Sequence, residues 1–253
     1  MPKNKKDLLC ISLLGIVCAQ PAFSYQNNTS ALMSWLKSSF VMTLSGGPGW
    51  TSPGETQTLN LAPGVIKTYT ANQSTDTIFG GDLFMGVQVP FANQLKGQVG
   101  LDIAATSNTN LSGDVWDDGD PEFNNYTYHY KIQHKHVALK GKLLIDRNWP
   151  VIPWISAEAG VGYNRASYFS SSPTIYQAVP VPGFASKTIS SFTFAVGIGF
   201  QHAIQKNWQV GLGYEFSDWG KSQLGSAEGS NTSGLSLSHL YVNSLLFNVT
   251  YVA

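Results

Sequence analysis

The feature that most constrains the fold is an alternation, with a period of two, between large apolar residues and small or polar residues. In the C-terminal segment 241–251, every second residue from position 245 is apolar: Leu245, Phe247, Val249 and Tyr251. Successive side chains of a β-strand point to opposite faces, so this period predicts a strand with one apolar face. Seven other segments repeat the pattern, at residues 39–47, 78–89, 97–106, 126–145, 154–164, 190–202 and 208–217.

The residues between the apolar positions indicate what the apolar face contacts. Three consecutive segments place six glycines there: Gly160, Gly162, Gly197, Gly199, Gly211 and Gly213. Small residues inside and large apolar residues outside are typical of a barrel in lipid, whereas a soluble barrel has the large side chains inside. Backbone groups in lipid must all be hydrogen-bonded, which requires closure. The sequence predicts an all-β fold, an eight-stranded antiparallel up-and-down transmembrane β-barrel.

The connections between these segments fall into two length classes. Residues 91–96, 146–153 and 203–207 are short connections, and residues 50–77, 107–125, 166–188 and 218–239 are long ones. Short turns at one end and long loops at the other are typical of outer-membrane barrels. The first long connection contains two more apolar stretches around Pro63 and Gly64. They predict either a hairpin outside the membrane or two extra strands, so a ten-stranded barrel stays possible.

Two details of the segments lead to further predictions. In segment 126–145, Tyr126, Tyr128 and Tyr130 have the opposite parity to Val137 and Leu139, which predicts a bulge near residues 133–135. Aromatic residues gather near the ends of the segments and predict two belts at the membrane interfaces. The short-turn belt would contain Phe91, Trp149, Trp154, Trp208 and Tyr251, and the other belt Trp50, Phe79, Tyr163, Phe192, Phe216 and Trp219.

Composition and the N-terminus define the class of protein and its domains. Charged residues make up 12 % of the chain, below the roughly 25 % of soluble domains, and 15 basic residues balance 15 acidic ones. This balance argues against a nucleic-acid partner. Three lysines precede an apolar stretch at residues 8–19, and small residues follow at Ala22 and Ser24. We therefore expect a signal peptide at 1–24, a periplasmic lead-in at 25–37 and the barrel at 38–253.

Two motifs resemble those of a known group of proteins. The run from Gly211 to Gly220 alternates glycine with aromatic residues and ends in Asp218-Trp-Gly, and Tyr251 stands near the C-terminus, although Ala253 replaces a terminal aromatic residue. The chain resembles the small bacterial outer-membrane barrels of the opacity-protein and OmpA/OmpX-like superfamily. The resemblance implies a monomer in the bacterial outer membrane, with extracellular loops and periplasmic termini. Its implied partners are outer-membrane lipid, lipopolysaccharide and the barrel-assembly machinery.

The candidate site is a set of charged residues on the inward faces of the segments. Here it is called the lumenal network, and it comprises Asp82, Asp102, Lys140, Lys142, Glu158 and Glu215, with His136 close by. An eight-stranded barrel is just wide enough to be filled by side chains, so charges inside it must pair. We expect Lys140 and Lys142 to flank Glu158 in a structural salt-bridge network. The alternative is a gated path for small ions.

We predict no enzyme, because no nucleophile stands beside a base. Barrels that deacylate lipid A carry a His-x-Ser pair near the last strand, whereas His239 is followed two residues later by Tyr241. We predict no cofactor and no metal site. His134 and His136 nevertheless share a face and could ligate a metal. The acidic run of Asp114, Asp117, Asp118, Asp120 and Glu122 could bind divalent cations.

The superfamily includes adhesins, structural anchors and small pores, so the motifs do not decide the function. We predict a structural or adhesive role, with host surface ligands bound by the long loops. The alternative is a narrow pore for small solutes, and a lipid-modifying envelope enzyme is less favoured.

Overall fold

The structure, a computed structural model, describes residues 38–92, 94–147, 149–176, 178, 183–227, 229 and 232–253. The predicted signal peptide (1–24) and lead-in (25–37) lie outside the described residues. Among the described residues, no helix is both long enough and apolar enough to span a membrane.

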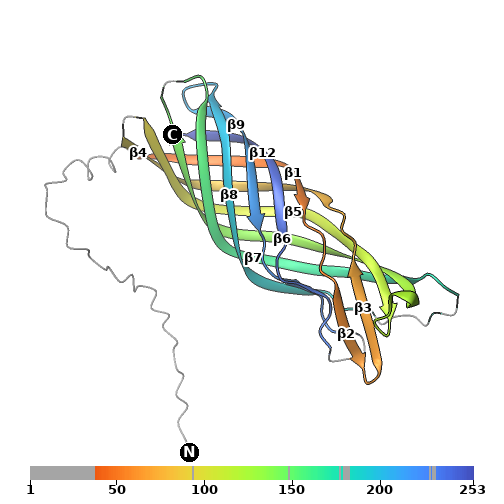
Figure 1. Cartoon of the computed structure of the whole chain (residues 1–253). Helices are drawn as coiled ribbons and strands as arrows, with labels where there is room; N and C mark the ends of the chain where they lie inside the picture. The colour runs from red at the N-terminus through yellow and green to blue at the C-terminus, as the bar shows by residue number, and fades with distance from the viewer. Residues whose placement is uncertain are drawn as a thin grey trace, which may run out of the picture.

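Eight antiparallel strands form a closed ring, as the alternation predicts (Figure 1). Each strand pairs with the next, and the last pairs with the first. The ring consists of β1 (Ser39–Thr51), β4 (Asp76–Ala92), β5 (Leu95–Asp117), β6 (Asn124–Ile145), β7 (Ile152–Pro173), β8 (Lys187–Ala203), β9 (Trp208–Asp218) and β12 (Tyr241–Val252).

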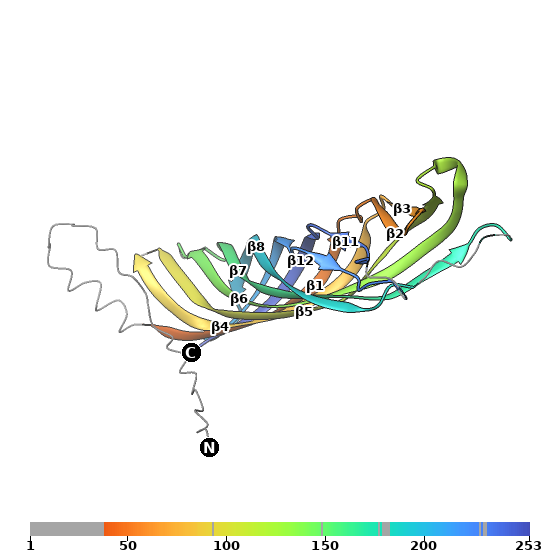
Figure 2. The ribbon, with the colours of Figure 1, turned by 90° about the horizontal axis from the view of Figure 1, so that it is seen from below.

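The two extra apolar stretches form a hairpin rather than ring strands. They are β2 (Gln57–Ala62) and β3 (Val65–Ala71), which pair with each other, and β3 also pairs with the far end of β5. The ten-stranded alternative is therefore wrong. β3 pairs with residues 113–117 of β5, beyond the stretch of β5 that pairs with β4 in the ring. Figure 2 shows this hairpin beside the long ends of β5 and β6.

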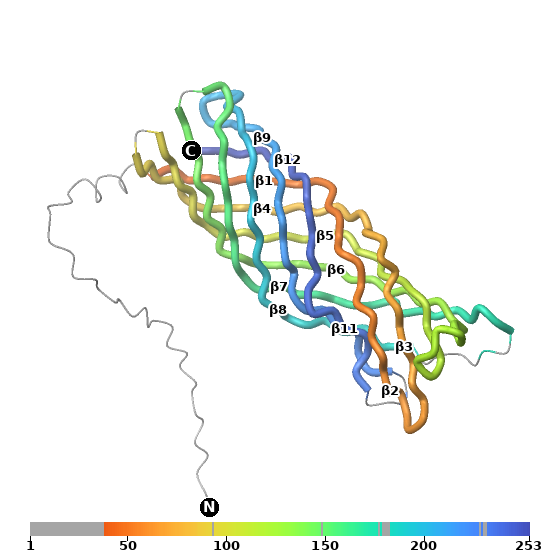
Figure 3. Tube along the Cα trace, in the orientation of Figure 1, coloured from red at the N-terminus to blue at the C-terminus, as the bar shows by residue number. Residues whose placement is uncertain are grey.

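The seam of the barrel lies between β12 and β1, which provides the closure that the sequence predicts. Leu44 pairs with Val249, and the pairing runs from Val41 to Thr51. The Ala253 N–H donates a hydrogen bond of 2.9 Å to the Phe40 carbonyl and so continues the seam to the last residue. The C-terminus lies at the same end of the barrel as the short turns (Figure 3).

The two faces of the ring differ as predicted. Leu139 is 61 % exposed and Phe247 is 60 % exposed on the outer face, whereas Asp102 and Thr250 on the inner face are fully buried. Large apolar side chains on an outer surface are stable where the surrounding medium is lipid. The outer face is therefore the lipid-facing surface of a membrane barrel.

The long connections are more ordered than the sequence indicates. The prediction of a loop at 107–125 is wrong for most of its length, because β5 and β6 remain paired up to Trp116 and Asn124. A short 3-10 helix, Pro121–Phe123, joins them and is capped by Asp120. β7 likewise extends to Pro173. The three short connections agree with the prediction.

The predicted bulge in β6 is also wrong. Even-numbered residues of β6 point inward along its whole length from Tyr126 to Ala138, and the extra residues lie in the partner strands, at 106–107 of β5 and 168–169 of β7. The even-numbered residues of β6 thus face inward throughout, but the medium outside the strand changes along its length. Beyond the membrane the outer face meets water, so the apolar residues, such as Tyr128, occupy the inner face.

Those inner residues belong to an apolar cluster that closes the long-loop end of the barrel, called the cap here. It combines the β2–β3 hairpin, the ends of β5 to β7 and the last long connection, which contains the short strands β10 (Ser222–Gln223) and β11 (Ser236–Leu237). Its buried members are Leu61, Tyr69, Ile78, Leu111, Val115, Tyr126, Tyr128, Tyr130, Ile132, Ala166, Phe184, Trp219, Leu224, Ala227, Leu235, Leu237, Leu240 and Val242.

Two tryptophans assigned to the interface belts lie inside the barrel instead. Trp154 and Trp219 are both buried, whereas Phe91 and Phe79 are exposed on the outer face as expected. Trp154 has the same strand parity as Glu158, so its ring enters the lumen. Trp219 follows the end of β9 and folds over the mouth of the ring, where it joins the cap.

Candidate functional site

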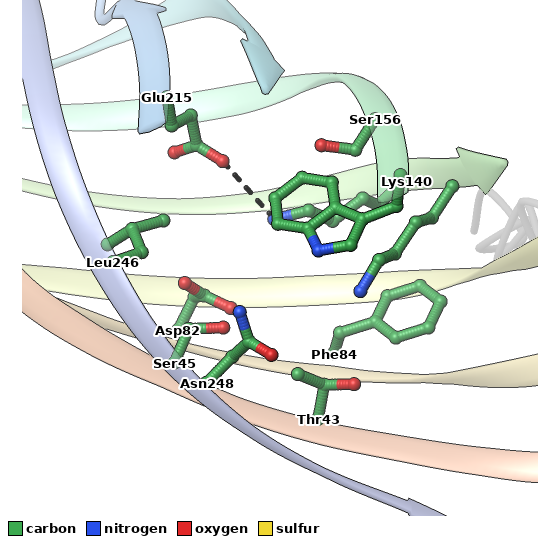
Figure 4. Close-up of a pocket in the computed structure, with 11 residues that line it drawn as sticks. Thr43, Ser45, Asp82, Phe84, Lys140, Ser156, Glu215, Leu246 and Asn248 are labelled. Atoms are coloured by element: carbon green, nitrogen blue, oxygen red, sulfur yellow. Dashed lines mark hydrogen bonds and ion pairs between the residues drawn. The ribbon is translucent and has the colours of Figure 1, made fainter. Parts of the chain in front are cut away.

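The lumenal network lies within the ring, as predicted from strand parity. β4, β5, β6, β7 and β9 each contribute at least one of its six residues. Asp82, Asp102 and Glu158 are buried, and the side chains of Lys140 and Glu215 are only slightly exposed. In Figure 4, Glu215 and Lys140 point toward one another across a pocket in the barrel.

Lys140 is the centre of this network. Its Nζ lies 2.9 Å from Glu158 Oε2, 3.3 Å from Asp102 Oδ1 and 3.5 Å from Glu215 Oε2. Glu158 and Asp102 belong to the strands on either side of β6, whereas Glu215 belongs to β9, which does not pair with β6. One ammonium group therefore connects opposite walls of the barrel.

Lys142 does not pair with Glu158, in contrast to the prediction. Its Nζ donates a hydrogen bond of 2.7 Å to Gln201 Oε1 and lies 4.4 Å from the centre of the Trp154 ring. A cation over an indole face is attracted by the negative face of the ring. The two lysines are two residues apart on one face, so only Lys140 reaches the carboxylates while Lys142 lies nearer the short-turn end.

The space around the network is small. One cavity of about 30 Å³ touches Asp82, Lys142 and Glu215, and another of about 40 Å³ touches Asp82, Asp102 and His136. A water molecule needs roughly 10–15 Å³ of such space, so each cavity holds only a few waters. Asp82 forms no ion pair among the described residues, and its Oδ1 is buried without a hydrogen-bond partner there.

Two histidines link the network to the cap. His134 Nε2 lies 3.0 Å from His136 Nδ1, and His136 Nε2 lies 3.1 Å from Glu158 Oε1 and 3.6 Å from Asp102 Oδ2. On its other side, the His134 ring stacks on Trp219 with a centroid distance of 4.3 Å. The prediction that the two histidines share a face is confirmed.

Sequence reasoning missed Asn164, which holds the histidine pair in place. Its Oδ1 lies 2.7 Å from His134 Nδ1, and its Nδ2 donates to the carbonyls of Trp219 and Lys221. Strand parity at residues 154–164 places Asn164 on the inner face, but the carbonyl partners come from the chain after β9. Local pattern alone therefore could not identify its role.

The remaining candidates form separate, simpler arrangements. His239 Nδ1 lies 2.7 Å from Asp218 Oδ2, and Tyr241 stacks on the His239 ring, so an aromatic ring stands where a nucleophile is needed. In the acidic run, Asp117 pairs with Lys67, and Asp120 caps the 3-10 helix. Among the described residues the acids of this run do not converge on a common point.

Comparisons with known proteins concern the whole barrel. No curated protein matches the chain at a significant level. Among solved structures, it is similar to Neisserial surface protein A (TM-score 0.42, 13 % identity, 84 % of this chain and 96 % of that one). It is also similar to OprG from Pseudomonas aeruginosa (TM-score 0.47, 18 % identity, 84 % and 96 %) and to the protease OmpT from Escherichia coli (TM-score 0.47, 6 % identity, 85 % and 97 %). With identities and TM-scores this low, none of the three bears on what this chain binds or does.

The family model described as "outer membrane protein beta-barrel domain" matches residues 12–251. This match covers nearly the whole ring, the cap and the lumenal network together. The chain therefore belongs to the outer membrane protein β-barrel family and is a protein of the bacterial outer membrane.

Proposed function

We propose that this protein is a monomeric structural and adhesive barrel whose cap is extracellular and binds host or envelope components. The observation that carries the proposal is that the long connections build a packed cap above the ring instead of separate loops. Loops held by a rigid scaffold are the usual place for binding. In this orientation the short turns and the C-terminus face the periplasm.

The outer ends of the extended strands offer a binding surface. It is called the tip surface here and comprises Phe123, Tyr168, Ile175 and Tyr176, all of which are exposed. Tyr176 is 100 % exposed and Tyr168 is 70 % exposed, although no lipid surrounds them beyond the ring. Aromatic residues are enriched at protein interfaces, and tyrosine is prominent among the residues that contribute most to binding.

The backbone of Tyr168 adds support. Its φ angle is 58°, in the left-handed region, at the position where β7 has an extra residue relative to β6. This conformation is uncommon for a residue other than glycine and costs of order 1–3 kcal/mol, and such strain gathers at functional sites. It places the ring in the exposed tip surface, with Lys131 Nζ 5.8 Å from its centre.

The test is binding of barrel-displaying bacteria to cultured epithelial cells. Replacing Tyr168 and Tyr176 together by serine should lower binding about tenfold or more, because each buried aromatic anchor contributes 1–2 kcal/mol or more. Gln73→Ala, a change at an exposed position of the β3–β4 connection, is the matched control. Equal binding by the double variant and the control, at equal surface amounts, would contradict the adhesive role.

A narrow, gated pore is the second candidate. It is favoured by the polar lumen and by the two small cavities on either side of the bridge between Lys140 and Glu215. Planar-bilayer recordings distinguish the two functions. Single-channel steps in the wild type that change with Glu215→Gln would support the pore, whereas a silent bilayer would favour the purely structural and adhesive role.

A further inference from the structure

The hydrogen-bond chain that begins at Asn164 determines where its protons lie. Asn164 Nδ2 lies 2.7 Å from the Trp219 carbonyl and 2.8 Å from the Lys221 carbonyl. Carbonyl oxygens only accept, so the amide nitrogen must face them and Oδ1 must face His134. Since Oδ1 also only accepts, His134 Nδ1 carries a hydrogen across the 2.7 Å contact.

The same logic continues to His136. His134 is fully buried, stacks on Trp219 and contacts no carboxylate among the described residues, so burial favours its neutral form. Its Nε2 then has a lone pair, which accepts the hydrogen of His136 Nδ1 across 3.0 Å. The other nitrogen of His136, Nε2, faces two carboxylate oxygens. A proton or a metal ion must therefore lie between this nitrogen and the carboxylate oxygens.

The distances suit a metal ion. His136 Nε2 is 3.1 Å from Glu158 Oε1 and 3.6 Å from Asp102 Oδ2, and one ligand atom from each of the three residues lies within 4.8 Å of the others. Ligands of a tetrahedral zinc ion, bound at roughly 2.0–2.1 Å, are about 3.3 Å apart. Asp102 Oδ2 is buried and accepts no hydrogen bond among the described residues.

The surrounding groups support this set of ligands. Lys140 contacts the other oxygen of each carboxylate, Glu158 Oε2 and Asp102 Oδ1, and so leaves the oxygens near His136 available. The second nitrogen of His136 lies 3.0 Å from His134 Nε2, and a hydrogen bond at that nitrogen fixes the ring orientation of a metal-bound histidine. The 40 Å³ cavity beside the site has room for a water molecule as fourth ligand.

Charge balance points the same way. The lumenal network contains four carboxylates and two ammonium groups. With every group ionised these six side chains sum to a formal charge of −2, which one divalent cation would balance. Uncompensated buried charge is costly.

We propose that Asp102, His136 and Glu158 bind one divalent transition-metal ion of the zinc class, which joins β5, β6 and β7 inside the barrel. The sequence alone does not predict this metal site. Its three ligands come from three different strands, so no short motif in the chain brings them together. The site is structural, since the cap and the filled lumen separate it from large substrates. This site is independent of the adhesive function.

The test uses the full mature chain refolded from urea into detergent, with either Zn²⁺ or EDTA present, and then dialysed. Refolding gives the ion access to the lumen before the barrel closes. Elemental analysis should find one zinc ion per chain after refolding with Zn²⁺. Refolding with Co²⁺ should give the strong visible absorption of a tetrahedral ion with nitrogen and oxygen ligands.

His136→Gln should lose the ion and the cobalt spectrum, and His129→Gln, a change at an exposed position of the same strand, should retain both. Heat-dependent migration in gels reports folding of each variant. If His136→Gln does not fold, the ion content of Asp102→Asn and the cobalt spectrum of the wild type test whether these residues bind a metal ion. Folded wild-type barrel without a stoichiometric ion, or His136→Gln with an unchanged ion content, would overturn the proposal and leave His136 simply protonated.

Discussion

Lys140 and Glu215 form an ion pair across the lumen, with Nζ 3.5 Å from Oε2, although their strands are not neighbours in the ring. The other two carboxylates at Lys140, Asp102 and Glu158, stand on β5 and β7, the strands next to β6. Together with Asp102 and Glu158, this pair makes Lys140 the one cation held by three walls among the described residues. The stability of the barrel should therefore depend strongly on this single side chain.

Lys140→Met should lower the free energy of unfolding by about 3–5 kcal/mol, because it leaves buried carboxylates without their cation. Urea unfolding in detergent, followed by tryptophan fluorescence, measures the change. Lys135→Met, on the exposed face of the same strand, is the control and should have little effect. Similar unfolding midpoints for both variants would contradict the central role of Lys140.

Gly213→Ala should destabilise the barrel by about 1–3 kcal/mol through overpacking. An added Cβ would lie 2.6 Å from two atoms of the Trp154 ring. The cost should shrink when Trp154 is also changed to Leu, and a double-mutant cycle measures this coupling. Gly141→Ala is the control, because its Cβ would meet only the Ala157 carbonyl oxygen, at 4.0 Å. Additive effects of the first two changes would show that the ring and the glycine are not coupled.

Leu237→Ala should loosen the cap but leave the ring intact. Leu237 is almost completely buried in the cap, and such a truncation costs about 2–5 kcal/mol of packing. Local opening then makes residues 222–240 accessible, so limited proteolysis should cut there faster while heat-dependent migration persists. Unchanged cleavage would mean that the last connection is held by other contacts.

Leu139→Arg should hinder insertion, because this side chain lies on the lipid-facing surface of β6. A charge near the middle of that surface costs about 2–4 kcal/mol. Folding yield into vesicles should fall, whereas Thr127→Arg, on the same strand beyond the ring, should fold like the wild type. Equal yields would place residue 139 outside the lipid.

The eight-stranded ring could be predicted because the side of a strand on which a residue lies depends only on its position in the local sequence. The alternation around Phe247 and the glycines such as Gly199 predicts the outer and inner faces without any knowledge of partners. The same parity places Asp102, Lys140 and Glu158 in the lumen. The N-terminal prediction of a signal peptide lies outside the described residues and stays a prediction.

The cap could not be predicted in the same way, since it depends on where the membrane ends. Tyr126 to Ile132 keep the inward parity of β6, but the sequence alone does not mark the level at which the outer medium changes from lipid to water. The pattern therefore predicts a bulge in β6 that the structure does not contain. The prediction that Trp154 and Trp219 lie in the interface belts is wrong for a related reason. An aromatic ring near a strand end can point into the lumen or toward the lipid.

Sequence by itself determined which residues face inward and which face lipid, because a period of two requires only the chain's own geometry. The tertiary structure alone decided which inward residues meet. Lys142 contacts Gln201 instead of Glu158, and Lys140 reaches Glu215 across the lumen, because closure of β12 on β1 sets the stagger of all eight strands at once. His136, Asp102 and Glu158 converge for the same reason.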